Sequence, residues 1–201
     1  MSIGLAILAA GGSSRMGEPK QLLRYAGKTL IEHIIAAAAR SVCSPIVIVL
    51  GAHADRIEQE IEIPSSVQVV FNKDWQEGLS SSLRSGVQAV RRIDGDSEGI
   101  VTVLCDQPFV TSEVIDNIVQ QFHTSGKLIV ASQYSDVFGP PALFHSCLFD
   151  ELLQISGDKG ARSVVDRHSS EATSVQFPNG AVDVDTLDDY LALCPEAQAR
   201  S

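Results

Sequence analysis

The chain has 201 residues, which at ordinary domain sizes makes one domain with a sizeable core that needs no disulfides or metals. Hydrophobic residues make up 44% and charged residues 20%, and this balance excludes a disordered chain. The formal net charge of −10 argues against nucleic acid and anionic membranes as partners, because both require a broad basic surface.

Short runs rich in Val, Ile and Leu alternate with helical patterns along the first two thirds of the chain. Such runs are typical of strands that are buried on both faces of a sheet. The predicted strands are residues 3–9, 46–50, 67–71, 99–104 and 128–132. The predicted helices are residues 29–40, 54–61, 80–92 and 111–122, the last with Thr111 as its N-cap.

The pattern weakens after Tyr134, which suggests a substrate-side part of the same domain rather than a second domain. A loop is predicted at residues 138–141. Short strands are predicted at residues 142–144, 174–177 and 181–184, and helices at residues 146–154, 159–167 and 185–193.

Alternating strands and helices imply right-handed crossovers and a mostly parallel sheet between two helix layers, which is a three-layer α/β/α fold. In such sheets ligands bind beyond the carboxyl ends of the strands. Polar loops follow the first, third and fourth predicted strands, so we expect the functional site there.

The N-terminal apolar run has no basic residue ahead of it, so we interpret it as a buried strand rather than a signal peptide. No apolar run approaches the roughly 18–20 residues that span a bilayer. The four cysteines, Cys43, Cys105, Cys147 and Cys194, are scattered, which fits reduced thiols better than disulfides or a zinc site. We therefore expect a cytoplasmic protein with no membrane partner.

The loop after the first strand, AAGGSSRMGEPK at residues 9–20, is rich in small residues. Small residues let backbone N–H groups approach a ligand closely, and Arg15 and Lys20 add positive charge to an acidic protein. Such a combination predicts a phosphate-binding loop, with a glycine-rich surface turn as the alternative. Neither G-x-x-x-x-G-K-[ST] nor G-x-G-x-x-G fits, because Gly17 is followed by Glu18 and the glycine spacing differs.

Two further loops carry polar residues at strand ends. Gly78, Ser80 and Ser81 follow the third strand, where serines can cap the next helix or contact a nucleotide base. Asp106 follows a buried strand, so its carboxylate must find solvent, a cation or a hydrogen bond. Mg²⁺ takes one or two carboxylates together with substrate phosphates, and capping of the next turn is the alternative role.

Near the C-terminus, Asp183 and Asp185 stand two residues apart and would point to the same side of a strand. Either could complete a metal site with Asp106. Asp185 also stands where the N-cap of the last helix is expected, with Asp188 and Asp189 in a first turn favoured by the helix dipole.

The segment LAAGGSSRMGEPK at residues 8–20 resembles the signature loop of nucleotidyltransferases that join a nucleoside triphosphate to a phosphorylated acceptor. In its L-A-A-G-x-S-x-R-M-G-x-x-K form it is most similar to the molybdenum cofactor cytidylyltransferase family, within the MobA-like NTP transferase superfamily. The related guanylyltransferases tend to carry Leu-x-Gly-Gly at its start. The likeness covers most of the chain and is strongest at residues 5–28, 76–86, 102–109 and 179–190.

The resemblance implies a single Rossmann-like nucleotidyltransferase domain over residues 1–201. Residues 1–133 would form the nucleotide-binding part, and residues 134–201 the acceptor side with the closing metal element. The implied nucleotide-binding residues are Leu8, Ala9, Ala10, Gly11, Gly12, Ser13, Ser14, Arg15, Lys20, Gly78, Ser80, Ser81 and Asp106.

Arg15, Lys20 and Asp106 are the implied catalytic residues, with Arg15 and Lys20 stabilising the leaving pyrophosphate. The D-Q-P element implies Asp106 as a ligand of Mg²⁺, with Mn²⁺ as an alternative. The D-V-D-T element implies Asp185 as the second ligand, with Asp183 in reserve.

The acceptor side is implied by two further segments. Gly139 and Pro141 match a G-x-P element, although Pro140 replaces the His that many relatives carry. Lys159 and Arg162 of the G-D-K-G-A-R segment would hold the acceptor's phosphate, and an N-capped helix with a solvated basic face is the alternative.

The implied reaction is Mg²⁺-dependent transfer of CMP from CTP to the phosphate of molybdopterin, with release of pyrophosphate. Transfer from GTP or to a sugar or polyol phosphate is the enzymatic alternative. A non-catalytic carrier that delivers the molybdenum cofactor is the other alternative. A molybdenum hydroxylase or its maturation factor would be the protein partner.

Overall fold

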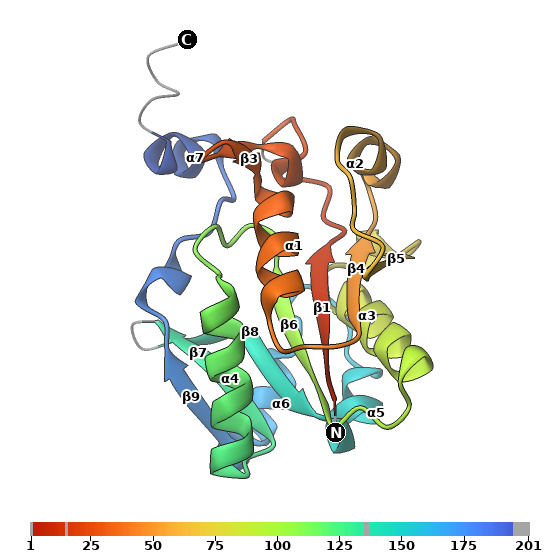
Figure 1. Cartoon of the computed structure of the whole chain (residues 1–201), viewed down its shortest axis with the longest axis vertical. Coiled ribbons are helices and arrows are strands. Elements are labelled where there is room, and N and C mark those ends of the chain that lie inside the picture. The colour runs from red at the N-terminus through yellow and green to blue at the C-terminus, as the bar shows by residue number, and fades with distance from the viewer. Residues whose placement is uncertain (1, 15, 135–136, 195–201) are drawn as a thin grey trace.

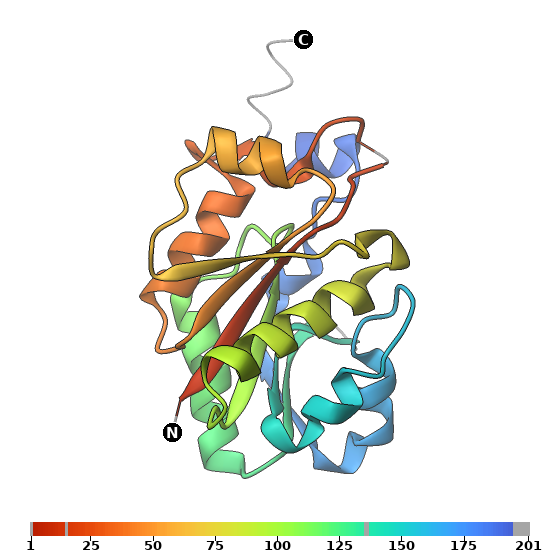
Figure 2. The same ribbon diagram turned by 90° about the vertical axis from the view of Figure 1, so that its right-hand side faces the viewer.

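The computed structural model describes residues 2–14, 16–134 and 137–194. A seven-stranded sheet with the order β5-β4-β1-β6-β8-β7-β9 runs through the molecule, between two layers of helices (Figures 1 and 2). Its strands are β1 (Ile3–Ala9), β4 (Ile46–Leu50), β5 (Val67–Phe71), β6 (Gly99–Leu104), β7 (Ile129–Tyr134), β8 (Val137–His145) and β9 (Ala172–Gln176). The α-helices are α1 (Leu30–Arg40), α2 (Ala54–Glu60), α3 (Leu79–Ile93), α4 (Ser112–Ser125), α5 (Phe149–Leu152), α6 (Arg162–Arg167) and α7 (Leu187–Leu193).

The sheet is mostly parallel, as predicted. Strand β1 pairs in parallel with β4 and β6, β4 with β5, and β7 with β9. Only β8 runs against its neighbours β6 and β7 in this sheet of the described chain. The three-layer α/β/α expectation is thereby confirmed.

Strand β1 is the centre of the core because both of its faces are buried. Leu5 and Ile7 face the layer of α1 and α4, and both are fully buried there. Ala6 and Leu8 face α3 and belong to the core on the other side of the sheet. Burial on both faces explains why the strand is an uninterrupted apolar run.

Helix starts are set by short polar side chains. Thr29 caps α1 through a capping box with Glu32, and Thr111 accepts a hydrogen bond from the backbone N–H of Val114 at the start of α4. The predicted N-cap role of Thr111 is confirmed.

The predicted loop at residues 138–141 is wrong, because these residues belong to β8. The register between β7 and β8 shifts where Gly139 pairs with Ser132 and Ala142 pairs with Ala131. Pro140 and Pro141 lie in that bulge, where their missing N–H groups leave no ladder bond unmade. Strand β8 therefore continues through the two prolines because it pairs with β7 on both sides of them, and the local composition does not reveal this pairing.

The C-terminal predictions also need correction. The predicted strand at residues 181–184 is a 3-10 turn (Pro178–Ala181) followed by extended chain, and the N–H of Val184 donates to the carbonyl of Asp106 at 3.0 Å. Helix α7 is capped by Thr186 in a capping box with Asp189, so Asp185 is not the N-cap. The longer helices expected at residues 146–154 and 159–167 shrink to α5 and α6, each of six residues or fewer.

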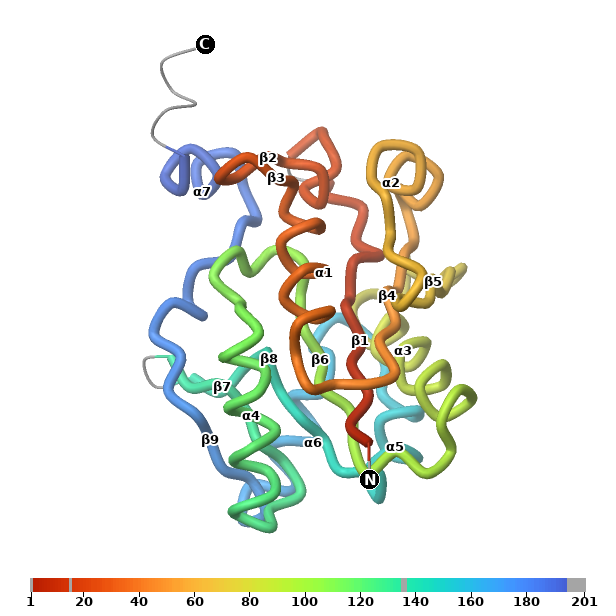
Figure 3. The backbone as a smooth tube through the Cα atoms, viewed as in Figure 1, coloured from red at the N-terminus to blue at the C-terminus, as the bar shows by residue number. Residues whose placement is uncertain are grey.

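Two short elements cover the carboxyl edge of the sheet beside α7. A two-stranded hairpin of β2 (Arg24–Tyr25) and β3 (Lys28–Thr29) follows the first loop. The hydroxyl of Tyr190 in α7 donates to the carbonyl of Arg24 at 2.9 Å, so the two elements lie side by side (Figure 3). No helix within the described ranges is both long and apolar enough to cross a bilayer.

Packing of α3 against β1 generates a stability prediction. A Cβ added at Gly4 would overlap Cγ1 of the buried Val90 in α3. Because Val is stiff at χ1, Gly4→Ala is expected to destabilise the fold by about 1–3 kcal/mol in urea denaturation. Gly95→Ala is the matched control, since its Cβ would meet only the Arg91 carbonyl at 3.8 Å, and it should stay within about 0.5 kcal/mol. Equal stability of the two variants would contradict this packing.

Candidate active site

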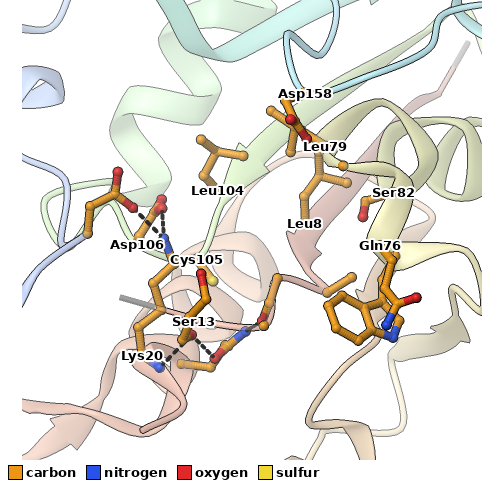
Figure 4. Close-up of a pocket in the computed structure, with 18 residues that line it drawn as sticks. Leu8, Ser13, Lys20, Gln76, Leu79, Ser82, Leu104, Cys105, Asp106 and Asp158 are labelled. Carbon is orange, nitrogen blue, oxygen red and sulfur yellow. Dashed lines mark hydrogen bonds and ion pairs between the residues drawn. The ribbon is translucent and has the colours of Figure 1, made fainter. Parts of the chain in front are cut away.

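A cleft of about 430 Å³ opens beyond the carboxyl ends of β1 and β6 (Figure 4). Three segments form most of its wall: the loop after β1, the turn that leads into α3, and the residues at the end of β6; Asp158 and Asp185 add to it from two further segments. The predicted site residues that line it are Leu8, Ala10, Gly11, Gly12, Ser13, Ser14, Lys20, Gly78, Asp106 and Asp185. The structure thus brings together residues from both ends of the chain. Arg15 lies outside the described residues.

Lys20 is the cation that joins two carboxylates in the cleft. Its Nζ donates to Asp106 Oδ2 at 2.6 Å and to Asp185 Oδ1 at 2.8 Å. Burial acts to lower the pKa of Lys20, but the negative charge of Asp106 and hydrogen bonds to both carboxylates outweigh burial and raise it. Lys20 is therefore a permanent cation that holds two carboxylates together.

The carboxylate pair suits a divalent cation. Asp106 Oδ1 is buried and has no hydrogen-bond partner among the described residues, while its other oxygen contacts Lys20. An orphaned buried carboxylate oxygen is costly unless a cation or donor reaches it. Groups of three or more His, Cys, Asp or Glu in a metal-binding arrangement are absent from the described part of the chain. Mg²⁺ needs only one or two carboxylates beside phosphates, so this donor set fits it.

Asp183 lies close enough to Asp106 and Asp185 for their charges to shift its pKa. Partial burial of its carboxyl group, and then the charges of Asp106 and Asp185, raise its pKa. Asp185, by contrast, shares the Lys20 ammonium with Asp106. The geometry therefore favours Asp185 over Asp183 as the partner of Asp106, and metal ligation by either remains a prediction.

The start of α3 forms the opposite wall. Gly78 has φ of 97°, in the region that favours glycine, and the N–H of Ser80 donates to the carbonyl of Gly157 at 3.1 Å. Ser80 is fully buried with no partner for its hydroxyl among the described residues, and the Ser81 hydroxyl donates to the Gly78 carbonyl at 2.8 Å. Ser82, rather than either of them, lines the cleft, so contact of Ser80 and Ser81 with a base remains a prediction.

A second cavity of about 260 Å³ adjoins the first and shares Leu8, Leu79 and Leu104 with it. Gly139, Lys159 and Arg162 line it, as the acceptor prediction requires. Pro141 does not line it, and its carbonyl instead accepts a hydrogen bond from Ser132 Oγ at 2.8 Å. The remaining walls are mostly apolar, with Val137, Phe138, Phe144 and Val165 among them.

Several cleft residues were not anticipated from the sequence, Trp75, Asp158 and Gln21 among them. Trp75 packs close to Gly12, Asp158 lies beside Gly78, and Gln21 binds the backbone of the first loop. Trp75 is the only tryptophan of the chain and stands in a polar segment, which was the one available signal. Asp158 belongs to the G-D-K-G-A-R segment, of which only Lys159 and Arg162 were given a role, and Gln21 carries no spacing that a motif would detect.

Cys105 is not a nucleophile, although it adjoins Asp106. Burial and the neighbouring carboxylate raise the pKa of its thiol to about 12. A neutral buried thiol is inert, so this cleft does not support covalent thiol chemistry.

The raised pKa of Asp183 predicts a pH-dependent stability change in the metal-free protein. Because the folded-state pKa exceeds the unfolded value of 3.8, ionised Asp183 destabilises the fold above the folded pKa, and the penalty vanishes as pH falls to the unfolded value. Asp183→Asn should raise Tm at neutral pH and leave it unchanged below pH 3.8. The gain is small, because solvent screens this partly exposed group. Asp96→Asn, in an exposed loop, is the control, and an equal gain there would contradict the assignment.

Comparison with known proteins places these features in context. The family described as "MobA-like NTP transferase domain" matches residues 5–172. Nicotine blue oxidoreductase of Paenarthrobacter nicotinovorans is 32% identical over 165 residues, which cover 78% of each chain. Molybdenum cofactor cytidylyltransferase of Escherichia coli K12 is 25% identical over 193 residues, 94% of each chain. A Mycobacterium tuberculosis H37Rv protein crystallised in complex with manganese is 30% identical, with a TM-score of 0.79 over 97% of this chain and 99% of that one.

Proposed function

The chain belongs to the MobA-like NTP transferase family and is a nucleotidyltransferase; on that premise we propose that it transfers CMP from CTP to the phosphate of a molybdopterin-type cofactor, with release of pyrophosphate. The observation that carries the proposal is the Lys20 ammonium between Asp106 and Asp185, beside a small-residue loop at the end of β1. The L-A-A-G start of that loop supports CTP over GTP as the donor.

The first loop and Lys20 would hold the triphosphate. Loop amides can donate to phosphate oxygens, and the permanently charged Lys20 can neutralise charge that develops on the leaving pyrophosphate. An attacking phosphate is already ionised at neutral pH, so no side chain has to act as a general base. The protein's contribution is then alignment of the two substrates and neutralisation of charge.

Asp106 and Asp185 would hold the divalent cation, Mg²⁺ or Mn²⁺. When bound, such a cation neutralises phosphate charge and acts as a Lewis acid toward a phosphoryl oxygen. Support comes from the orphaned Asp106 Oδ1 and from a similar protein crystallised with manganese. Asp183 adds a third negative charge nearby.

The second cavity would take the acceptor. Its apolar walls suit a flat heterocycle, and Lys159 and Arg162 supply charge for a phosphate. Because the two cavities share Leu8, Leu79 and Leu104, an acceptor phosphate there would sit next to the nucleotide. In this proposal residues 1–133 bind the nucleotide, and residues 134–201 form the acceptor side. A cytoplasmic location and a molybdenum hydroxylase as client complete the proposal.

Removal of either charged catalytic group tests the nucleotide site. Asp106→Ala and Lys20→Ala are each expected to lower pyrophosphate release from CTP with molybdopterin by about a hundredfold or more, the scale for losing one transition-state contact. Asp166→Ala and Lys127→Ala, which remove the same charges from positions that line neither cavity, should keep parental turnover. Near-parental activity in both cleft variants would overturn the proposed mechanism.

Removal of the basic acceptor groups tests the second cavity. Lys159→Ala and Arg162→Ala are each expected to raise KM for the acceptor about tenfold, the scale of one hydrogen bond to a charged group, while KM for CTP stays unchanged. Initial rates of pyrophosphate release at varied acceptor and fixed CTP measure this. An equal rise in both KM values would place these residues outside an acceptor site.

The oxidoreductase relative supports a second candidate, the reduction of a heteroaromatic compound in the apolar cavity. Parallel incubations decide between the two: one contains CTP, Mg²⁺ and molybdopterin, and the other contains nicotine blue and a reduced nicotinamide dinucleotide. Pyrophosphate release without bleaching supports nucleotidyl transfer, and bleaching without pyrophosphate release supports reduction. Release with GTP or with a sugar or polyol phosphate would redirect the substrate assignment. Tight cofactor binding with neither reaction would indicate a carrier.

A further inference from the structure

Gln21 is a buried polar residue that makes all of its described hydrogen bonds to one loop. It is only 1% exposed and belongs to the 3-10 turn Lys20–Leu22. Its Nε2 donates to the carbonyl of Ala9 at 3.0 Å and to that of Gly11 at 2.8 Å, and its Oε1 accepts from Ser13 Oγ at 3.3 Å. One side-chain amide therefore holds three positions of the loop after β1.

Those bonds decide which way the loop amides point. In a trans peptide the C=O and N–H groups point in opposite directions, so holding the Gly11 carbonyl against Gln21 turns the Gly12 N–H away from it. His53 Nε2 lies 3.1 Å from the Gly12 carbonyl, and since a carbonyl only accepts, this nitrogen must donate. The Ser13 N–H is turned away from His53 in the same manner.

The two turned amides are available to a ligand. Within residues 2–14, 16–134 and 137–194, no acceptor is matched to the N–H groups of Gly12 and Ser13. Both residues line the cleft, and Ser13 has φ of 50°, a conformation that a non-glycine residue adopts only when its surroundings hold it. Consecutive free amides in such a turn form an anion-binding concavity.

We propose that Gln21 is a positioning residue for polyphosphate binding: it holds the Gly11 carbonyl back so that the Gly12 amide faces the ligand, while the His53 contact with the Gly12 carbonyl orients the Ser13 amide. The proposal rests on the function proposed above, because it assumes a triphosphate in this cleft. Gln21 acts through the loop and touches no reacting atom. The same unit positions Lys20, whose backbone N–H donates to Ser13 Oγ at 3.0 Å.

Only an amide of this length can fill the role. Gln21→Met keeps the bulk but removes the amide donor that the Ala9 and Gly11 carbonyl oxygens share. Gln21→Glu places a carboxylate against the same two carbonyls and adds negative charge beside a phosphate site. We therefore expect Gln21→Glu to weaken polyphosphate binding more than Gln21→Met does.

Trp75 supplies a direct measurement of binding that does not require turnover. It is the only tryptophan, it lines the cleft, and a Cβ at Gly12 would lie 3.0 Å from its Cζ3 atom. Titration of its fluorescence with CTP, with CMP and with inorganic pyrophosphate, each with Mg²⁺, gives three dissociation constants. Gln21→Met should weaken CTP and pyrophosphate about tenfold and lower the CTP-to-CMP affinity ratio by a similar factor.

A general loosening of the fold would weaken CTP and CMP alike, so the affinity ratio separates positioning from a structural defect. Gln133→Met is the matched control, because its Oε1 accepts from Ser174 and Gln176 between β7 and β9, and it should leave all three constants unchanged. If Gln21→Met does not fold, His53→Phe serves in its place, because it removes the contact with the Gly12 carbonyl from a position outside the core. It should lower the CTP-to-CMP affinity ratio in the same way. Parental affinity for CTP and pyrophosphate in Gln21→Met overturns the proposal. If Gln21→Met does not fold, parental affinity in His53→Phe overturns it. Failure of the parent protein to bind CTP or pyrophosphate would instead overturn the proposed function.

Discussion

The structure of the site depends on one buried cation between two carboxylates. Lys20 follows the first strand, Asp106 follows the fourth predicted strand, and Asp185 lies near the C-terminus, so this single ammonium joins three distant segments. Lys20 and Asp106 are both largely buried, with side-chain exposures of 15% and 13%. In that setting, loss of one partner would leave uncompensated charge in a poorly solvated cleft.

Under the proposed function, the same interaction would help a chain with net charge −10 to bind a polyanion. The negative charge near the cleft is partly neutralised, because Asp106 and Asp185 share the single positive charge of Lys20. A divalent cation at Asp106 Oδ1 would add positive charge at the same point and would share the carboxylates with Lys20. Local pairing, rather than the overall charge balance, therefore decides which ligands the cleft tolerates.

The fold supplies two adjoining cavities with different surfaces. The first is bordered by loop amides, Lys20 and carboxylates, and the second by apolar side chains with Lys159 and Arg162 at its edge. Leu8 and Leu104, at the ends of β1 and β6, contribute to both. In the proposed reaction, the parallel pairing of those two strands would fix the distance between nucleotide and acceptor, which is what transfer between two bound substrates requires.

The sequence by itself determined the buried strands and the chemical character of the first loop. Strands 3–9, 46–50, 67–71 and 99–104 were confirmed to the residue, because polar loops end their apolar runs sharply, and every residue of β1 and β4 is buried. Only the tertiary structure decided that β8 passes through two prolines, that Thr186 rather than Asp185 caps α7, and that Gln21 shapes the loop. Each of these involves a partner elsewhere in the fold: a neighbouring strand for β8, the distant Lys20 that contacts Asp185, or backbone carbonyls whose directions are set only when the loop folds back. The residue type determines which hydrogen bonds and contacts a side chain can make, and the topology of the fold determines which partner lies within reach.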